Sequence, residues 1–266
     1  MRWLRRRADL RRLAPRRVAL EAELAQLFRA PCTLVPAVSK GGYDQIFYAV
    51  SGGIRRAVVR VNNPHRKPHE AVHPRLPLVA LAPAARLARE WDAYSRLFPL
   101  GLAPQPLWRT GDAMACSWVD RTRASAALTR QHAGVWSFAA TAFPAVRRMH
   151  EAGVVHLDLN LGNLLFQPGD DRLQFIDFEY GPADWVSVEQ QMAYDYLRLI
   201  DDLLRPRRGG RLLLADPERL LARVRDVIPA PVAQARTGFA FAKLRQLAAN
   251  TGFCHKLSAI FPALRQ

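Results

Sequence analysis

The chain has 266 residues, and half of them are hydrophobic, which provides enough apolar material for a core and excludes a disordered protein. The formal net charge of +16 favours a polyanionic partner: nucleic acid, an anionic membrane surface or a phosphorylated substrate. The longest apolar stretch, residues 76–85, contains two prolines and is about half as long as a membrane-spanning helix, and the three scattered cysteines favour a reducing compartment over a disulfide framework or a metal site.

Residues 1–17 form a basic arm with eight arginines and one acid, Asp9, so +7 of the formal charge lies there. No apolar run follows the arginines, and we therefore expect no secretory signal. Pro15 interrupts the ragged apolar stripe of the arm. A regular helix is expected from Val18 to Phe28, where leucines recur at helical spacing.

Strand patterns dominate the segment that follows. Residues 45–50 and 57–61 are rich in β-branched and aromatic side chains and flank a glycine-containing turn, so they predict a hairpin. Residues 62–83 hold five prolines and are expected to form a loop. An apolar stripe predicts a helix over 84–97, and short strands should follow through 114–119.

The rest of the chain is mostly helical by pattern. Residues 136–150 include an apolar helical face, and Gly153 is a natural end for this helix. Two short apolar segments, 163–166 and 173–176, are joined by a Pro-Gly-Asp-Asp turn. Helical patterns return at 187–204 and continue towards the end of the sequence.

The polar residues that suggest chemistry lie in one short region, HLDLNLGN at 156–163 and FIDFE at 175–179. Phosphoryl transfer from ATP is accelerated mainly by positioning and charge neutralisation. It needs hard oxygen ligands that hold Mg²⁺ against the phosphates, and one further carboxylate that accepts the hydroxyl proton. Asp158, Asn163 and Asp177 can supply these groups from a loop and two strand ends.

The spacing of these residues resembles that of a known superfamily. Asp158 precedes Asn163 by five residues, as in the kinase catalytic loop H-x-D-L-x-x-x-N, and Asp177 follows across a hairpin at the position of the DFG aspartate. The chain is thus similar to the protein-kinase-like phosphotransferases. The string HLDLNLGNLL…FIDFEYG looks closest to lipopolysaccharide core sugar kinases, choline kinases and aminoglycoside phosphotransferases, which replace DFG with D-[FW]-[DE].

The resemblance implies a fold of the α+β class, the bilobal protein-kinase-like fold. In that fold a small strand-rich N-lobe precedes a helical C-lobe. Residues 1–29 would be the basic N-terminal arm and first helix, residues 30–120 the N-lobe and residues 121–266 the C-lobe.

The resemblance also implies roles for individual side chains. Asp158 would be the catalytic base, and Asn163 and Asp177 would hold Mg²⁺, with ATP as the phosphate donor. Arg60 stands at the β3 position where the family usually has lysine, and Glu90 at the position of the acid that holds this cation. The alternative is that Arg60 is an exposed cation on an edge strand and Glu90 a solvated helix charge.

Further candidates lie outside the catalytic loop. Lys40, Gly41 and Gly42 either bring backbone N–H groups close to phosphate or form an ordinary turn. Trp118 lies where the family holds adenine by the backbone of its hinge. Asp195 is expected either to cap the backbone of the catalytic loop or to be a solvated helix charge.

The fold alone does not decide which acceptor is phosphorylated. Four possibilities remain: a lipid-linked sugar, a protein side chain, a small metabolite, or no acceptor at all. The short chain, its basic charge and the helical pattern that begins soon after Glu179 favour a sugar hydroxyl of the lipopolysaccharide core. A serine/threonine protein kinase and a choline-kinase-like enzyme are the alternatives. The intact catalytic motif disfavours a pseudokinase scaffold, and the single aromatic residue of the arm, Trp3, disfavours a nucleic-acid-binding protein.

These features predict a cytoplasmic enzyme with a lipid-linked or small-molecule acceptor and no nucleic-acid partner. Each basic residue near an anionic bilayer contributes about 1 kcal/mol to binding. Residues 1–17 therefore predict peripheral docking on the inner membrane, and a disordered tail is the alternative.

Overall fold

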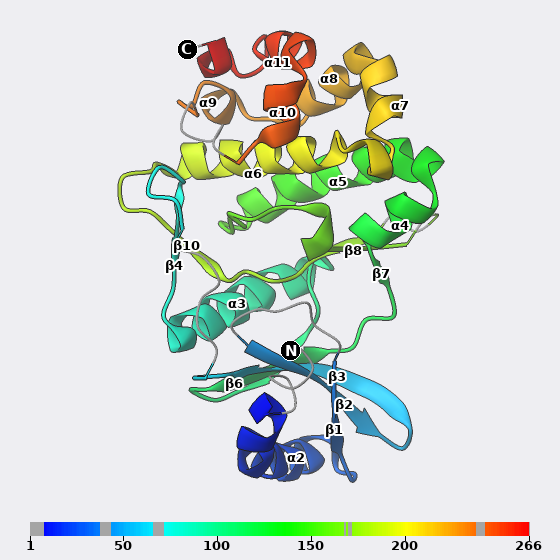
Figure 1. Ribbon diagram of the computed structural model, residues 1–266, viewed down its shortest axis with the longest axis vertical. Helices are drawn as coiled ribbons and strands as arrows, with labels where there is room; N and C mark the ends of the chain where they lie inside the picture. The colour runs from blue at the N-terminus through cyan, green and yellow to red at the C-terminus, as the bar shows by residue number, and fades with distance from the viewer. Residues whose placement is uncertain are drawn as a thin grey trace. The chain divides into compact units, whose positions relative to one another are not determined.

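The computed structural model describes residues 8–37, 44–65, 72–167, 169, 172–237 and 243–265 (Figure 1). The chain divides into two compact units. The first consists of residues 1–71, 82–91 and 104–119, and the second of residues 72–81, 92–103 and 120–266. Helix α3 (Pro83–Leu97), which the sequence predicts, contributes residues to both units.

The first unit is built on a five-stranded antiparallel sheet in the order β1-β2-β3-β6-β5. The strands are β1 (Thr33–Pro36), β2 (Asp44–Ser51), β3 (Ile54–Asn62), β5 (Pro106–Arg109) and β6 (Ala113–Ser117). Gly52 and Gly53 join β2 to β3 with φ values of 58° and 77°, which glycine adopts without the steric cost of a Cβ. The predicted hairpin is confirmed.

Helix α2 (Ala14–Phe28) packs against one face of this sheet. Side chains alternate along a strand, so each strand presents one set of residues to the helix and the other set to the opposite face. The buried cluster consists of Leu20, Leu24, Cys32, Leu34, Phe47, Ala49, Ala57, Val59, Val61, Ala113 and Ala115. The alternate positions of β2 and β3, among them Tyr48 and Arg60, are half-buried, so the Arg60 cation stands on the face away from α2.

Helix α2 begins earlier than the sequence predicts, at Ala14 and not at Val18. Pro15 lies in the first turn of the helix, where its missing N–H costs no hydrogen bond and its fixed φ suits the helix. It therefore starts the helix and does not interrupt it. Arg16 donates to both carboxylate oxygens of Asp112 at 2.7 Å, so this end of the basic arm is part of the folded unit.

The second unit is mostly helical, and its longest helices, α5 (Val135–Glu151) and α6 (Val188–Leu203), pack against each other (Figure 1). Helix α6 starts with a capping box, in which the Ser187 side chain and the Gln190 side chain each accept the other's backbone N–H. The shorter helices are α4 (Ala124–Arg130), α7 (Gly210–Ala215), α8 (Pro217–Arg225), α9 (Ala230–Ala233), α10 (Arg245–Ala249) and α11 (Thr251–Leu257). The 3₁₀ turns are η1 (Phe98–Leu100), η2 (His132–Gly134), η3 (Leu161–Asn163), η4 (Pro206–Arg208) and η6 (Pro262–Arg265).

Two small antiparallel sheets complete the second unit. β7 (Thr122–Arg123), β8 (Leu164–Phe166) and β9 (Leu173–Phe175) form one sheet, and β4 (Leu78–Ala80) pairs with β10 (Tyr180–Pro182) in the other. β8 and β9 correspond to the two apolar segments singled out in the sequence. β4 lies inside the proline-rich stretch expected to be a loop, and that prediction is wrong there, because β10 supplies backbone partners from far along the chain.

The described elements confirm the expected α+β organisation, with a strand-rich first unit and a helical second unit. Within the described ranges, no helix combines the length and the apolar character needed to cross a bilayer.

Candidate active site

The catalytic-loop segment, residues 156–163, is anchored at its start by Asp195 of α6. The buried Asp195 carboxylate accepts the backbone N–H of His156 at 2.8 Å and that of Leu157 at 2.7 Å. His150 Nε2 lies 3.1 Å from the same carboxylate. These bonds replace the water that a buried carboxylate gives up. The expectation that Asp195 caps this backbone is confirmed, and the alternative of a solvated charge is wrong.

His156 connects the loop to the segment that carries Asp177. Its Nδ1 accepts the backbone N–H of Asp158 at 3.4 Å, and its Nε2 lies 3.0 Å from the carbonyl of Ile176. Because Nδ1 accepts, Nε2 carries the proton and donates to that carbonyl. The ring is fully buried and packs on Phe178, with ring centroids 4.5 Å apart. Both nitrogens are thus engaged in holding the loop.

The Asp158 carboxylate is held at both of its oxygens. Arg198 Nη2 donates to Oδ1 at 2.9 Å, and Asn160 Nδ2 donates to Oδ2 at 3.1 Å. The Asp158 side chain keeps 25% of its surface exposed, so a hydroxyl group can reach it as a general base requires. Burial lowers the pKa of the Arg198 guanidinium, but Asp158 and Tyr194 raise it, and because the net shift is upward Arg198 stays cationic.

Asn163 and Asp177 are brought together by the backbone. The N–H of Ile176, the residue before Asp177, donates to the carbonyl of Asn163 at 3.0 Å. The Asn163 side-chain nitrogen donates to the carbonyl of Asp158 at 3.0 Å, which fixes the orientation of the amide. An amide oxygen and a carboxylate are hard oxygen donors that suit Mg²⁺, a cation that keeps water and phosphate oxygens as further ligands. The two residues therefore fit the metal site predicted from the sequence.

Two residues of this region have a left-handed backbone conformation that non-glycine residues rarely adopt. The φ angles are 69° at Leu157 and 74° at Asp177. Such conformations cost on the order of 1–3 kcal/mol each and persist where the surrounding structure imposes them. Leu157 is held by Asp195 and immediately precedes Asp158. The strain therefore occurs where the chain turns to present the Asp158 and Asp177 carboxylates.

In the first unit, Arg60 of β3 pairs with Glu90 of α3. Arg60 Nε lies 3.0 Å from Glu90 Oε2, and the side chains are 15% and 4% exposed. β3 is an inner strand between β2 and β6. The alternative of an exposed edge-strand cation and a solvated acid is therefore wrong, and the two residues have the contact that the resemblance implies.

A second acid and a second arginine belong to the same group. Asp44 Oδ2 lies 3.4 Å from Arg60 Nη1, and Asp44 Oδ1 accepts from Arg86 Nη2 at 2.7 Å. Two arginines and two carboxylates balance in charge, and pairing of this kind is what makes buried charges tolerable. Sequence reasoning missed Asp44 and Arg86, because Asp44 lies two residues after a glycine pair typical of a turn and Arg86 is one of several arginines in α3.

Trp118 follows β6 and belongs to a small aromatic cluster of the first unit. Its backbone N–H donates to the carbonyl of Arg56 at 2.9 Å, and its ring meets Tyr48 edge-on with centroids 5.3 Å apart. The Arg55 guanidinium lies over both rings, 4.5 Å from the Tyr48 centroid and 5.0 Å from that of Trp118. Its role beside adenine stays a prediction. The residues predicted to form the phosphate loop, Lys40, Gly41 and Gly42, lie outside the part of the chain that the structure describes.

Sequence reasoning also missed three side chains that fix the catalytic loop: Asn160, Arg198 and Asp202. Asp202 of α6 accepts the backbone N–H of Leu161 at 2.9 Å. Asp195, Arg198 and Asp202 follow one another at intervals of three and four residues, so they share one side of α6. Charges at this spacing among the apolar residues of a helix were the signal that could have identified Arg198 and Asp202.

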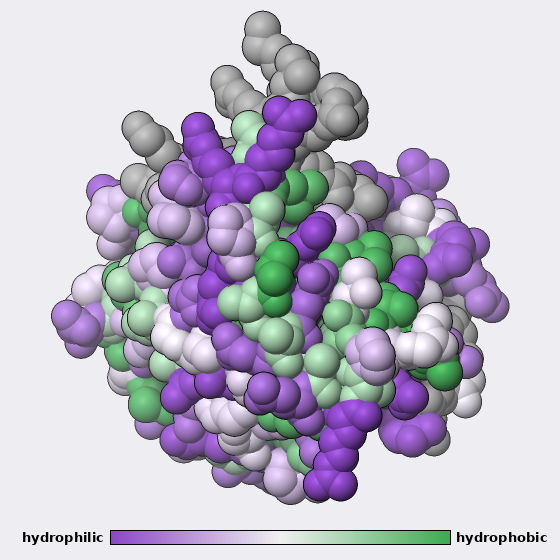
Figure 2. Space-filling view, turned by 90° about the horizontal axis from the view of Figure 1, so that it is seen from below, coloured by the Kyte–Doolittle hydropathy of each residue, from purple (hydrophilic) through white to green (hydrophobic). Residues whose placement is uncertain are grey.

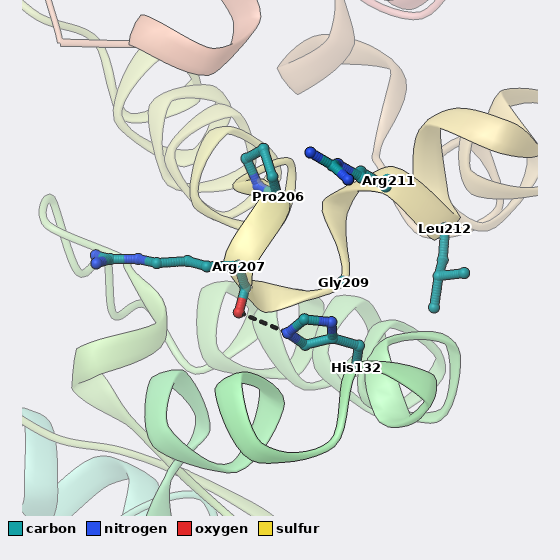
Figure 3. A pocket seen from close by; sticks show the side chains of 6 residues that line it. All are labelled: His132, Pro206, Arg207, Gly209, Arg211 and Leu212. Carbon is teal, nitrogen blue, oxygen red and sulfur yellow. Dashed lines mark hydrogen bonds between the residues drawn. The ribbon is translucent and has the colours of Figure 1, made fainter.

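A hollow of about 450 Å³ lies elsewhere in the second unit (Figure 3). It is lined by His132, Pro206, Arg207, Gly209, Arg211 and Leu212. The imidazole of His132 points to the carbonyl of Arg207, with Nε2 at 2.9 Å from the oxygen. Arg208, which lies between the lining residues Arg207 and Gly209 in the sequence, pairs with Asp202.

Residues 125–204, which include the whole catalytic loop and all of α6, match the model of the Lipopolysaccharide kinase (Kdo/WaaP) family. Among solved structures, this chain is similar to a double mutant of the Mycobacterium tuberculosis PknI kinase domain, with 18% sequence identity and a TM-score of 0.49. The alignment covers 81% of this chain and 95% of the PknI chain. The PknI kinase domain itself has 19% identity, a TM-score of 0.46, and coverage of 81% and 96%. None of the curated proteins matches the chain.

The family match falls on the segment in which the motif and the geometry place Asp158, Asn163 and Asp177. It confirms the resemblance predicted from the sequence, and with it the expectation of an ATP-dependent kinase of the protein-kinase-like fold. Over its catalytic part, the chain is similar to the lipopolysaccharide kinases of the Kdo/WaaP family.

Proposed function

We propose that the chain transfers the γ-phosphoryl group of ATP to a sugar hydroxyl of the lipopolysaccharide core. The observation that carries this proposal is the catalytic loop. Asp158 is held by hydrogen bonds beside Asn163, in a segment whose sequence matches a lipopolysaccharide kinase family. The choice of a core sugar as acceptor rests on this match and on the charge of the chain.

In this reaction the acceptor hydroxyl gives its proton to the Asp158 carboxylate, while its oxygen bonds to the γ-phosphorus and ADP leaves. Hydrogen bonds at both oxygens hold the carboxylate in place. Asn163 and Asp177 would hold Mg²⁺, which when bound neutralises phosphate charge. Arg60, held by Glu90, would contact phosphate oxygens through its planar guanidinium.

Charge and chain length support a small anionic acceptor. A net charge of +16 attracts an acceptor rich in phosphate and carboxylate and is unfavourable for a polycationic aminoglycoside. Residues 178–187 alone separate Asp177 from α6, and they include strand β10, which is paired with β4. This short connection leaves little chain for binding an extended protein substrate.

We also propose that the chain binds the anionic inner-membrane surface through the N-terminal part of the basic arm. Arg11 and Arg12 are exposed, and Val18 on α2 is 61% exposed. Figure 2 views the molecule from the side on which α2 lies and shows hydrophobic side chains set among hydrophilic ones. Arg16 is occupied by Asp112. The proposed surface therefore comprises the arginines of residues 1–12 and the outer face of α2.

The proposed acceptor is tested by offering deacylated core oligosaccharide, a protein mixture, choline and an aminoglycoside with Mg-ATP, and by measuring ADP release and phosphate incorporation. We expect transfer to the oligosaccharide. Faster transfer to one of the other acceptors would replace the proposed acceptor with that class.

Replacing Asp158 with asparagine should lower turnover by about 10²–10⁴-fold, the usual contribution of a general base. The affinity for Mg-ATP should stay close to that of the wild type, because asparagine keeps the size of the side chain. Steady-state kinetics and calorimetric titration measure the two effects. Asp226→Asn, which alters an exposed acid of the same unit, is the matched control. Turnover of Asp158→Asn within about threefold of the wild type would remove the base from this position.

Replacing Asp177 with asparagine should weaken Mg²⁺-dependent nucleotide binding and turnover together, because the metal loses a charged oxygen ligand. The measurement is a titration of MgCl₂ at fixed ATP concentration, followed by nucleotide binding and by rate. Binding of ATP in the absence of Mg²⁺ should be unchanged. An unaltered dependence on Mg²⁺ would exclude Asp177 as a ligand.

Arg60→Lys should remain partly active, whereas Arg60→Ala should lose nucleotide affinity and become less stable by about 3–5 kcal/mol, since the buried Asp44 and Glu90 lose a partner. Denaturant unfolding measures the stability and calorimetry the affinity. The lysine variant separates the two effects, because it keeps a positive charge beside both acids. Wild-type affinity in the alanine variant would mean that another cation, such as Lys40, contacts the phosphates.

Replacing Arg2, Arg5, Arg6, Arg7, Arg11 and Arg12 with glutamine should abolish sedimentation with anionic vesicles, because the attraction is electrostatic and is screened by salt. Neutral vesicles should bind neither protein. Arg16→Gln is the matched control, because its guanidinium is bonded to Asp112, and it should lower stability without changing vesicle binding. Equal binding of the six-fold variant and the wild type to anionic vesicles would contradict the membrane proposal.

A further inference from the structure

The catalytic loop contains no cation of its own. The sequence from His156 to Asn163 includes neither lysine nor arginine. The position two residues after Asp158 is occupied by Asn160, a neutral amide. A cation nevertheless stands beside the carboxylate, and it comes from another element, Arg198 of α6.

The guanidinium of Arg198 is directed at Asp158. Its side chain is 12% exposed, and Nη2 lies 2.9 Å from Asp158 Oδ1. The next acid, Asp201, is 4.0 Å from Nη1. Among the described residues, Arg198 Nε has no hydrogen-bond partner. Within the described part of the chain, the contact with Asp158 is the shortest ion pair that this arginine makes.

Arg198 and Asn160 together fix the plane of the Asp158 carboxylate. They bind different oxygens and come from different elements, one from a packed helix and one from the loop itself. A carboxylate bonded through one oxygen can still rotate about its last side-chain bond, whereas bonds at both oxygens oppose that rotation. Each oxygen has a second lone pair, so the acceptor hydroxyl can still donate to a carboxylate that is already oriented.

We propose that Arg198 is a positioning residue that orients the Asp158 carboxylate towards the acceptor hydroxyl. The proposal rests on the proposed function, because it presupposes that Asp158 takes the hydroxyl proton. Arg198 acts through Asp158 and does not bind the nucleotide or the acceptor. Its removal therefore lowers kcat and leaves the KM values for ATP and acceptor unchanged.

A double-mutant cycle tests this dependence. The variants are Arg198→Met, Asp158→Asn and the combination of the two, assayed with Mg-ATP and deacylated core oligosaccharide. Misplacement of a reacting group by about 1 Å costs about 10²-fold in rate, so Arg198→Met should lower kcat by about that factor. In the Asp158→Asn background the same replacement should cause no further loss, because no base is left to orient.

Two further variants control for folding and for loss of charge. Arg198→Lys keeps the charge and most of the packing, and it should recover part of kcat if the methionine variant folds poorly. Arg147→Met removes an exposed arginine paired with Glu151 on α5, and it should match the wild type. Circular dichroism and thermal melting establish that each variant compared is folded.

Any other result contradicts the proposal, and each such result points to a different role for Arg198 or Asp158. Losses that multiply in the double variant would show that Arg198 acts independently of Asp158. A raised KM for the oligosaccharide with unchanged kcat would show that Arg198 binds the acceptor directly. Wild-type kcat in Arg198→Met would remove any role in positioning. A wild-type protein that transfers phosphate to no acceptor, or an Asp158→Asn variant as active as the wild type, would overturn the proposed function itself.

Discussion

The catalytic loop depends on charged side chains buried along one side of α6. Asp195 binds the backbone N–H groups at the start of the loop, Arg198 binds the Asp158 carboxylate, and Asp202 binds the N–H of Leu161. Removing a carboxylate from water costs several kcal/mol, and these bonds offset that cost only while helix and loop stay together. A shift of the loop would break the bonds that Asp195, Arg198 and Asp202 make with it. The strained backbone at Leu157 is maintained by the same attachment.

The first unit uses buried charge in a different way. Arg60, Glu90, Asp44 and Arg86 pair two cations with two carboxylates, whereas the acids of α6 are stabilised by backbone N–H groups and by neighbouring arginines. A neutral group fixes the direction of the Arg60 side chain at a modest cost in desolvation. Helix α2 packs against the opposite face of the same sheet, where β3 contributes the buried residues Ala57, Val59 and Val61.

The parts predicted from the sequence are those set by neighbouring residues. Asp158 and Asn163 lie on one short loop, so their spacing alone indicates how they lie, and the β2–β3 hairpin follows from its glycine turn. Arg198 and strand β4 were not predicted, because each is defined by a partner distant in sequence. The start of α2 was predicted wrongly because the effect of a proline depends on its position. Proline breaks a helix when it lies in the interior but is favourable in the first turn, and the sequence pattern alone did not show which position Pro15 has.

The most direct test of the central claim is mass spectrometry of purified core oligosaccharide after incubation with the protein and Mg-ATP. The account predicts that the oligosaccharide gains the mass of one phosphate on a sugar hydroxyl, and that a reaction with ATP but no Mg²⁺ gives no product. An oligosaccharide of unchanged mass, under conditions in which the protein binds Mg-ATP, would contradict the claim that this catalytic loop phosphorylates a core sugar.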